Sequence, residues 1–316
     1  MNNKYAISIE SLSFSYGQQN ALNNFSCDIE EGEIFALLGP NGGGKTTLFK
    51  ILATLLPLQE GNAKIFEMML RNSPKEIRKF IGVVFQNPSI DIKLTVKENM
   101  THHGRLFNIT GKTLLKRIEQ NLEHFNLKER KNELAENLSG GLRRRLELAK
   151  TLITKRKILL LDEPSTGLDP AIRIDLSTEL KRLQKEDNTT IIFTTHHMDE
   201  AERSDRVGII HEGKLIAKGN PTELKKEIRN DIVIKIETNN PEELKKNISK
   251  KFRLEPNVLN ESLFINTSKD DDAIHELYHV FSDEIQSITF SQPSLEDVFV
   301  QKTGYQFKDI ENKSIK

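Results

Sequence analysis

The chain has 316 residues, 36% of them hydrophobic, which is enough for about two globular domains with a core in each. The 46 basic and 46 acidic residues give a formal net charge of zero, so no overall field would attract nucleic acid or anionic lipid. A single cysteine, Cys27, cannot form an intramolecular disulfide or a multi-thiolate metal site, which fits a reducing compartment. No nucleic-acid partner is therefore expected.

Hydropathy along the chain indicates no membrane-spanning segment. The first ten residues lack the apolar core of a signal peptide. The longest apolar stretch, residues 48–58, is interrupted by Lys50 and Thr54 and contains Pro57. We therefore expect neither a spanning helix nor secretion through a signal peptide.

The N-terminal part predicts strands that lead into a glycine-rich loop. Two alternating runs, Ala6–Phe14 and Phe25–Ile29, predict an antiparallel sheet at an edge. A continuous apolar run, Ile34–Leu38, predicts a buried strand, and helical spacing then runs from Thr46 to Leu56, before Pro57. The predicted order is strand, loop, helix.

The middle of the chain alternates helices with buried strands. Val83–Phe85 predicts a short strand, and leucines at helical spacing predict an inserted helical subdomain over about residues 90–152. Near-continuous apolar runs at Ile158–Leu161 and Thr190–Thr194, with a helix at Ala171–Gln184 between them, are typical of parallel strands buried on both faces. The predicted fold class is α/β.

The pattern changes after residue 220, so we predict one domain over residues 1–220 and a second over 221–316. A charged helix, Thr222–Arg229, opens the second domain. The next elements are strand Ile232–Ile236, helix Pro241–Lys250, strands Arg253–Val258 and Ser262–Ile265 with a turn at Asn260, helix Asp271–Phe281 and strand Ile285–Phe290. This βαββαβ order predicts a small ferredoxin-like α+β domain. A last helix, Ser294–Gln301, presents an apolar stripe of Leu295, Val298 and Phe299.

The glycine-rich loop carries the first chemical motif. Eight residues fit G-x-x-x-x-G-K-[ST], the Walker A pattern: Gly39, Pro40, Asn41, Gly42, Gly43, Gly44, Lys45 and Thr46, with Thr47 following. Glycines let backbone N–H groups surround phosphates, and a helix N-terminus adds its positive end. We expect Lys45 to reach the β- and γ-phosphates and the Thr46 hydroxyl to bind Mg²⁺. The core is thus predicted to be of the phosphate-loop, RecA-like type.

Two acids follow a second buried strand. Asp162 ends Ile158–Leu161, which places its carboxylate beside the phosphate loop, where Mg²⁺ takes oxygen ligands. Glu163 comes next and is expected to take a proton from the attacking water or to hold that water in line. The two motifs together predict a phosphate-loop NTPase and no more.

A third segment, Leu138, Ser139, Gly140 and Gly141, discriminates among such NTPases. With this segment, the sequence resembles the ATP-binding cassette (ABC) family over residues 4–220. The family's marks occur in order: Tyr16, the Walker A loop, Gln86, the run Leu138, Ser139, Gly140, Gly141, the acids Asp162 and Glu163, the turn Ser165 to Asp169, and His196. The resemblance implies ATP with Mg²⁺ as the bound species. The sequence departs from the family pattern at Gly43, where alanine is usual, at Leu142, where glutamine or methionine is common, and at His197, where tyrosine is common.

The resemblance also implies a role for each mark. Tyr16 would lie under the adenine, Gln86 would touch Mg²⁺ and the lytic water, and His196 would contact the γ-phosphate. Ser139, Gly140 and Gly141 would bind the γ-phosphate of a nucleotide held by another copy or by a homologous subunit, in a head-to-tail dimer. Blander interpretations stay open: Tyr16 and His196 as core residues, Gln86 as a surface amide, and Ser139 as a helix cap alone. The following arginines, 143–145, are expected on a solvated helix face, with one of them holding the two acids.

Within the family, four segments are similar to the ATPase subunits of drug-resistance, antibiotic and sodium-efflux exporters. These segments are 85–89, 94–99, 195–202 and 293–299. The similarity implies separate integral membrane permease subunits as partners and a peripheral position on the cytoplasmic side of the cell membrane. The C-terminal domain carries no catalytic motif, so we expect it to be regulatory, dimer-stabilising or partner-docking, and the alternative of a folding appendage without a separate role stays open.

Two other classes compete with a transport ATPase. A soluble ABC ATPase of DNA repair inserts a long coiled coil between the two loops, and Ser139 follows Lys45 too closely for one. The translation type fuses two cassettes, and this chain has one. A purely regulatory module that has lost hydrolysis is opposed by the presence of Lys45, Asp162, Glu163 and His196.

Overall fold

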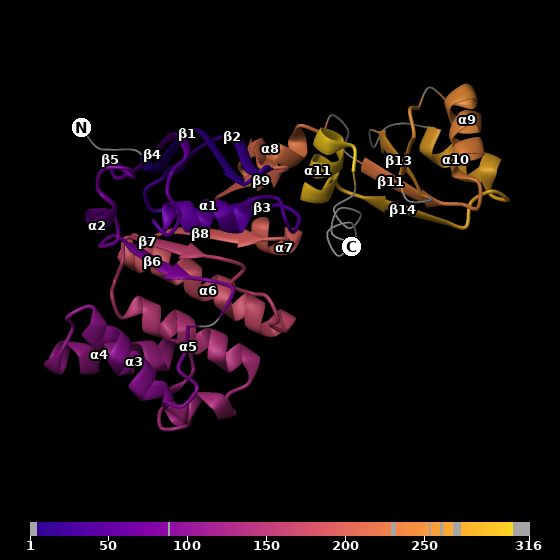
Figure 1. Ribbon diagram of the computed structural model, residues 1–316. Coiled ribbons are helices and arrows are strands. Elements are labelled where there is room, and N and C mark those ends of the chain that lie inside the picture. Colours follow the sequence, from indigo (N-terminus) through magenta and orange to yellow (C-terminus); the bar gives the residue numbers. More distant parts are fainter. Residues whose placement is uncertain are drawn as a thin grey trace. The chain divides into compact units, whose positions relative to one another are not determined.

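The computed structural model describes residues 5–87, 89–228, 232–252, 254–259, 262–267 and 273–305. The chain divides into two units, Met1–Ile216 and Ala217–Lys316. Figure 1 shows the sheets and helices of each. Within the described ranges, no helix combines the length and apolar character that a bilayer crossing requires.

A six-stranded sheet forms the centre of the first unit. Its strand order is β10-β9-β3-β8-β7-β6, and the strands from β9 to β6 are parallel. The bounds are β3 Ile34–Leu38, β6 Ile81–Val84, β7 Ile158–Leu161, β8 Thr190–Thr195, β9 Arg206–His211 and β10 Lys214–Gly219. Every residue of β3, β7 and β8 is buried, as expected where helices cover both faces of a parallel sheet. Strands β9 and β10 were not predicted from the sequence.

A second sheet, antiparallel, packs beside the first. Its order is β2-β1-β4-β5, with β1 Tyr5–Tyr16, β2 Gln19–Glu30, β4 Glu60–Ile65 and β5 Met68–Met69. β1 and β2 are longer than the alternating runs predicted, and β4 and β5 were not predicted. Phe25 of β2, Ile65 of β4 and Phe49 of α1 (Lys45–Leu52) share one buried cluster, which fixes this sheet against α1. Cys27 belongs to that cluster.

Helices cover the six-stranded sheet and extend beyond it. α1 and α6 (Pro170–Asp187) lie on opposite faces in Figure 1, and α3 (Val96–Leu106), α4 (Gly111–His124) and α5 (Gly140–Leu152) gather at the lower end of the unit. The predicted helix 46–56 is wrong at its end, because α1 stops at Leu52 and Thr54 adopts a positive φ of 61°. The shorter helices are α2 Pro74–Ile77, α7 Met198–Ala201, η1 Lys128–Arg130 and η2 Ala135–Asn137.

The C-terminal unit has its own antiparallel sheet, of order β12-β13-β11-β14. The elements are α8 Pro221–Lys226, β11 Ile232–Glu237, α9 Pro241–Lys251, β12 Asn257–Leu259, β13 Ser262–Thr267, α10 Ala273–Phe281, β14 Ser287–Ser291 and α11 Leu295–Thr303. Ile234, Leu244, Leu263 and Leu277 contribute to one core between the sheet and its helices. The stripe Leu295, Val298 and Phe299 of α11 is fully buried.

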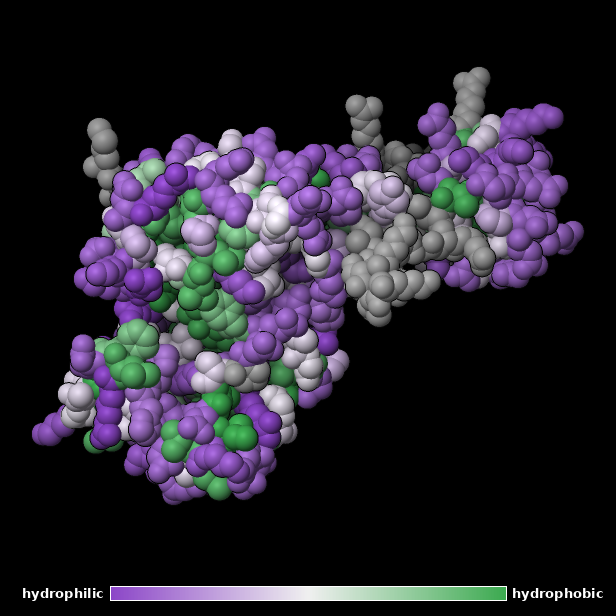
Figure 2. All heavy atoms as spheres, in the orientation of Figure 1, coloured by the Kyte–Doolittle hydropathy of each residue, from purple (hydrophilic) through white to green (hydrophobic). Residues whose placement is uncertain are grey.

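Several predicted boundaries in this unit do not match the structure. The strand predicted at 253–258 is wrong in its first part, because residues 254–256 lie outside β12. Some predicted positions lie outside the described residues: Arg253, Asn260, residues 271 and 272, the last residue of the charged helix at 229, and Pro88 within the segment 85–89. Figure 2 shows that hydrophilic residues cover most of the coloured surface of this unit, whereas hydrophobic residues gather on the visible face of the first unit.

Candidate functional site

The glycine-rich loop joins β3 to α1, and its glycines are required by its shape. Gly44 has a φ of 99°, and a Cβ atom there would lie 2.3 Å from the Ala21 carbonyl oxygen. At Gly39 a Cβ atom would lie 2.5 Å from the Ile210 carbonyl oxygen. Only glycine fits such backbone approaches. Pro40, Asn41, Gly42 and Gly43 complete the loop, and Thr46 and Thr47 follow in the first turn of α1.

Lys45, the first residue of α1, is buried within this loop. Its Nζ donates to the carbonyl oxygens of Gly39 at 2.7 Å and Pro40 at 3.0 Å. The same nitrogen lies 3.7 Å from Oε1 of Glu163, which directly follows the acid that ends β7. The loop thus holds its cation beside a carboxylate from another strand.

Asp162 comes directly after β7 and is 1% exposed. Its Oδ1 accepts a hydrogen bond from the Thr194 hydroxyl of β8 at 2.7 Å. Oδ2 is buried and has no hydrogen-bond partner among the described residues. A buried carboxylate oxygen without a donor suits a cation ligand.

A metal held here would need ligands besides the protein. In the described part of the chain, no group of three or more His, Cys, Asp or Glu side chains could hold a metal ion. Mg²⁺ in nucleotide sites takes one or two carboxylates together with substrate phosphates. Asp162, with Thr46 at the start of α1, fits that donor set.

The Glu163 carboxylate is the centre of the site. Besides Lys45, it meets the Thr166 hydroxyl at 3.0 Å, Nδ1 of His196 at 3.5 Å and Nε2 of Gln86 at 3.5 Å. The close His196 ring lowers the pKa of this carboxyl to about 2; burial opposes the effect, and the Lys45 charge and the Thr166 hydroxyl add to it. Glu163 is therefore ionised at neutral pH.

The partners of Glu163 come from the carboxyl ends of neighbouring parallel strands. Lys45 follows β3, Gln86 follows β6 and His196 follows β8, so the sheet brings them to one edge. The prediction that Gln86 ends a strand is wrong, since β6 stops at Val84 and Gln86 lies in the loop. The structure places His196, not His197, beside Glu163.

Residues that the sequence analysis missed set the backbone of the two acids. The Thr194 hydroxyl donates to Asp162 and accepts from the Glu163 N–H at 2.8 Å. That bond holds Glu163 at a φ of 45°, a conformation rare outside glycine. The sequence signal for a residue that binds the two acids is the pair Thr194 and Thr195, which ends strand β8 after an apolar run.

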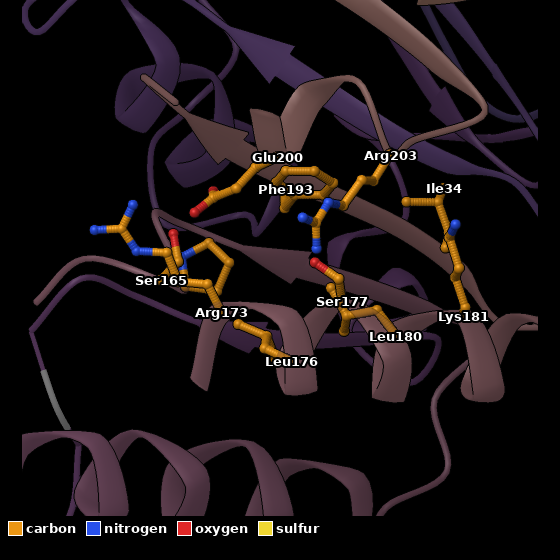
Figure 3. A pocket seen from close by; sticks show the side chains of 11 residues that line it. Ile34, Ser165, Arg173, Leu176, Ser177, Leu180, Lys181, Phe193, Glu200 and Arg203 are labelled. Atoms are coloured by element: carbon orange, nitrogen blue, oxygen red, sulfur yellow. The ribbon is translucent and has the colours of Figure 1, made fainter. Parts of the chain in front are cut away.

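A small hollow lies next to this edge. Figure 3 shows Glu200 and Phe193 opposite Leu176 of α6, with Ser165 and Arg173 at one end of the hollow. Glu200 is 7% exposed, and its Oε2 accepts from the Thr195 hydroxyl at 2.7 Å. The same Thr195 hydroxyl accepts from the His197 N–H at 2.9 Å, so Glu200 orients the hydroxyl that holds the backbone directly after His196.

Two predicted nucleotide-binding parts are not among the contacts of Glu163. Tyr16 ends β1, is 49% exposed and packs edge-on against Phe14, so its interpretation as a core residue is wrong. Ser139 caps α5, and its hydroxyl accepts from the Leu142 N–H at 3.4 Å. A Cβ atom at Gly140 would meet no atom within 4 Å, and one at Gly141 would first meet the Ile172 side chain at 3.0 Å.

Of the two expectations for the arginines after Gly141, the solvated helix face is wrong, whereas the expectation that one of them holds the two acids is confirmed by Arg144. Arg144 is 7% exposed and donates to the carbonyl oxygens of Asp162 and Glu163. Arg143 donates to the carbonyl oxygens of Ala135 and Glu136. Three consecutive helical positions cannot share one face, because each is rotated by about 100° from the last.

Comparisons with known proteins identify the family of the chain. Residues 22–166 match the family model described as ABC transporter. The chain is 33% identical to a daunorubicin resistance ATP-binding protein of Streptomyces coeruleorubidus, over 98% of both chains. It is 36% identical to the Nod factor export ATP-binding protein I of Rhizobium meliloti strain 1021, over 96% of this chain and 90% of that protein.

Solved structures share the fold of about 70% of the chain. CbiO1 of Clostridium perfringens, part of the CbiONQ complex, aligns with a TM-score of 0.66 at 30% identity, over 72% of this chain and 94% of that one. A dimeric ATP-binding cassette in a post-hydrolysis state, bound to ADP and Pi, aligns with a TM-score of 0.62 at 27% identity, over 68% of this chain and 98% of that one. The chain therefore belongs to the ATP-binding cassette transporter family, as one of its ATP-binding and ATP-hydrolysing subunits.

Proposed function

We propose that this chain supplies the ATP hydrolysis of an exporter whose permease is a separate integral membrane protein. The relatives named for daunorubicin resistance and Nod factor export match almost the whole chain, the C-terminal unit included. Attachment to such a permease would place the chain at the cytoplasmic side of the cell membrane, as a peripheral subunit.

The observation that carries the proposal is the convergence of Lys45, Gln86 and His196 on Glu163, with every contact between 3.5 and 3.7 Å. ATP phosphates would lie on the backbone N–H groups of the loop Gly39–Gly44, with Lys45 at the β- and γ-phosphates. Thr46, Asp162 and Gln86 would hold Mg²⁺, which when bound neutralises the charge on the phosphates. The exposed ring of Tyr16 would support the adenine.

The charge state of Glu163 favours one of its two expected roles. A carboxyl with a pKa of about 2 is a weak proton acceptor at neutral pH. An ionised carboxylate still accepts a hydrogen bond from water strongly. Glu163 would therefore hold the attacking water in line, with Gln86 beside it and His196 toward the γ-phosphate.

A second copy, or a homologous subunit, would complete each site. Neither a positive φ nor a neighbouring atom of the same chain requires a glycine at position 140. The empty space at Gly140 supports the approach of another subunit to this loop. Ser139, Gly140 and Gly141 would then contact the γ-phosphate that the other subunit holds. The sequence order of the C-terminal unit and its sheet order β12-β13-β11-β14 support a ferredoxin-like accessory domain for partner docking or regulation.

The test is co-purification of the tagged chain from solubilised membranes of its source. We expect a polytopic membrane protein in the complex and ATP hydrolysis that disappears when Glu163→Gln replaces the parent. A chain that ends after Asn220 should keep its ATP affinity, but a smaller amount of the membrane protein should co-purify with it. A complex without membrane protein, at full ATPase activity, would contradict the exporter function.

A further inference from the structure

Arg144 lies on α5, and its buried guanidinium uses every donor it has. Arginine carries five N–H donors in a rigid fork. Here all five meet an acceptor. The acceptors are the carbonyl oxygens of Pro164 (2.9 Å), Phe85 (2.7 Å), Asp162 (3.1 Å) and Glu163 (3.2 Å), and Oε2 of Glu147 (3.2 Å). One side chain therefore ties the loop after β6 to the loop after β7.

Glu147 and Lys150 extend this contact to the far end of the Gln86 segment. Oε1 of Glu147 accepts from the backbone N–H of Ser89 and from its hydroxyl, the latter at 2.9 Å. Nζ of Lys150 donates to the Ser89 carbonyl oxygen and, at 2.8 Å, to its hydroxyl. Glu147 is 1% exposed and Lys150 is 5% exposed. Since Arg144, Glu147 and Lys150 are three residues apart on a helix, they lie on one side of α5.

The Gln86 side chain lies between these two anchored ends. Phe85 is held by Arg144, and Ser89 is held by Glu147 and Lys150. Gln86 Nε2 is 3.5 Å from Glu163 Oε2, and the Glu163 carbonyl is itself bound by Arg144. The helix that Ser139 caps, α5, thus binds both segments that carry these two side chains.

We propose that Arg144, together with Glu147 and Lys150, is a positioning device for hydrolysis. It holds Gln86 against Glu163 without touching ATP. The proposal rests on the proposed function, because it assumes that Gln86 and Glu163 hold the attacking water. Buried side chains of α5 would then control the position of Gln86 relative to Glu163.

The charges of the cluster explain why these residue types are needed. Burial lowers the pKa of the Arg144 guanidinium, and the charge of Glu147 opposes that effect. Burial likewise lowers the pKa of the Lys150 ammonium, again opposed by Glu147. Glu147 thus offsets part of the effect of burial for both cations, and Asp162 adds to this for Arg144. Lysine at position 144 would keep the charge but present three donors from one point, so it could not reach acceptors on both loops.

The experiment compares Arg144→Lys with Arg145→Lys in the purified 316-residue chain. Arg145 is the matched control on the same helix, since it pairs at 2.9 Å with the exposed carboxylate of Asp175. Steady-state ATP hydrolysis, ATP affinity, the number of ATP sites per chain and the thermal midpoint are measured for each. Arg144→Lys should lower kcat by roughly 10- to 100-fold and leave ATP affinity and site number within about threefold. Arg145→Lys should keep the parent kcat.

If Arg144→Lys does not fold, Ser89→Ala tests the positioning role in its place. Ser89 is exposed, so removal of its hydroxyl should not threaten the core, and we expect kcat to fall by about threefold or more at unchanged ATP affinity. A parent-like kcat in a folded Arg144→Lys chain or in Ser89→Ala would overturn the proposal, as would a loss of kcat that only follows a loss of ATP sites. Glu163→Gln is assayed in parallel. If that variant keeps its turnover, the proposed function fails, whatever Arg144 does.

Discussion

The loops before α1 and α5 both contain glycines at a helix N-terminus, but they differ in what makes glycine necessary. In the first loop, Gly39 and Gly44 face backbone oxygens of their own chain at 2.5 Å and 2.3 Å from an added Cβ atom. In the second, Gly140 faces open space. The first loop is closed by the fold, with Lys45 inside it. In the second loop, the Ser139 hydroxyl caps the helix and Gly140 faces open space. We therefore propose that this loop contacts the nucleotide held by another subunit.

The largest effect should come from the centre of the closed site. Glu163→Gln keeps the shape of the side chain but removes the charge that orients water, so we expect turnover to fall by roughly 10²- to 10⁴-fold while ATP affinity stays near that of the parent. Phosphate release and equilibrium ATP binding measure the two quantities. Turnover close to the parent value would remove Glu163 from the mechanism.

Alanine substitution of the glycines distinguishes the two loops directly. Gly44→Ala forces an L-residue into a φ of 99° against the Ala21 carbonyl oxygen, so ATP affinity should fall by about 10-fold or more. Gly140→Ala should leave ATP affinity of the isolated chain unchanged and weaken only ATP-dependent association. Titration calorimetry and sedimentation measure these results. Equal effects of the two variants on ATP affinity would show that the second loop belongs to the same-chain site.

A smaller effect should appear in the dependence of stability on pH. The folded Glu163 carboxyl has its pKa lowered to about 2 from 4.5, so its ionised form stabilises the fold fully above pH 4.5, and this contribution is lost as the pH falls toward 2. The thermal midpoint of the parent should therefore fall more than that of Glu163→Gln between about pH 5.5 and 4, by about 2 °C. Parallel curves for the two chains would contradict the lowered pKa.

The sequence predicted those parts of the site that consist of short, contiguous motifs. The phosphate loop and the acids after β7 follow from residue types next to one buried strand. The sequence predicted that one of the arginines 143–145 holds the two acids, but not which one, because four of the five acceptors of Arg144 are carbonyl oxygens, which every residue carries. The burial of Arg144 depends on how α5 meets two loops far away in the sequence.

Fold boundaries failed for a related reason. The apolar spacing of residues 46–56 continues past the point where Thr54 leaves helical geometry, so periodicity alone overextends α1. Strand β4 pairs with β1, which is distant in sequence, and only the assembled sheet makes it a strand. The two-residue strand β5 pairs with β4 across a short turn and is too short to give an alternating pattern. In the C-terminal unit, the order of elements was readable although individual limits, such as the start of β12, were not.

The assignment of the open loop to a second subunit is tested most directly by sizing in the Glu163→Gln background. In that background ATP is bound and not cleaved, so an ATP-dependent dimer should accumulate, and light scattering should report twice the mass of the chain when ATP and Mg²⁺ are added. Adding Ser139→Arg places a long cation where the other subunit's γ-phosphate should lie and blocks close approach. We predict a monomer with ATP affinity like that of its parent. A Ser139→Arg chain that dimerises with ATP as well as its parent would contradict the head-to-tail site.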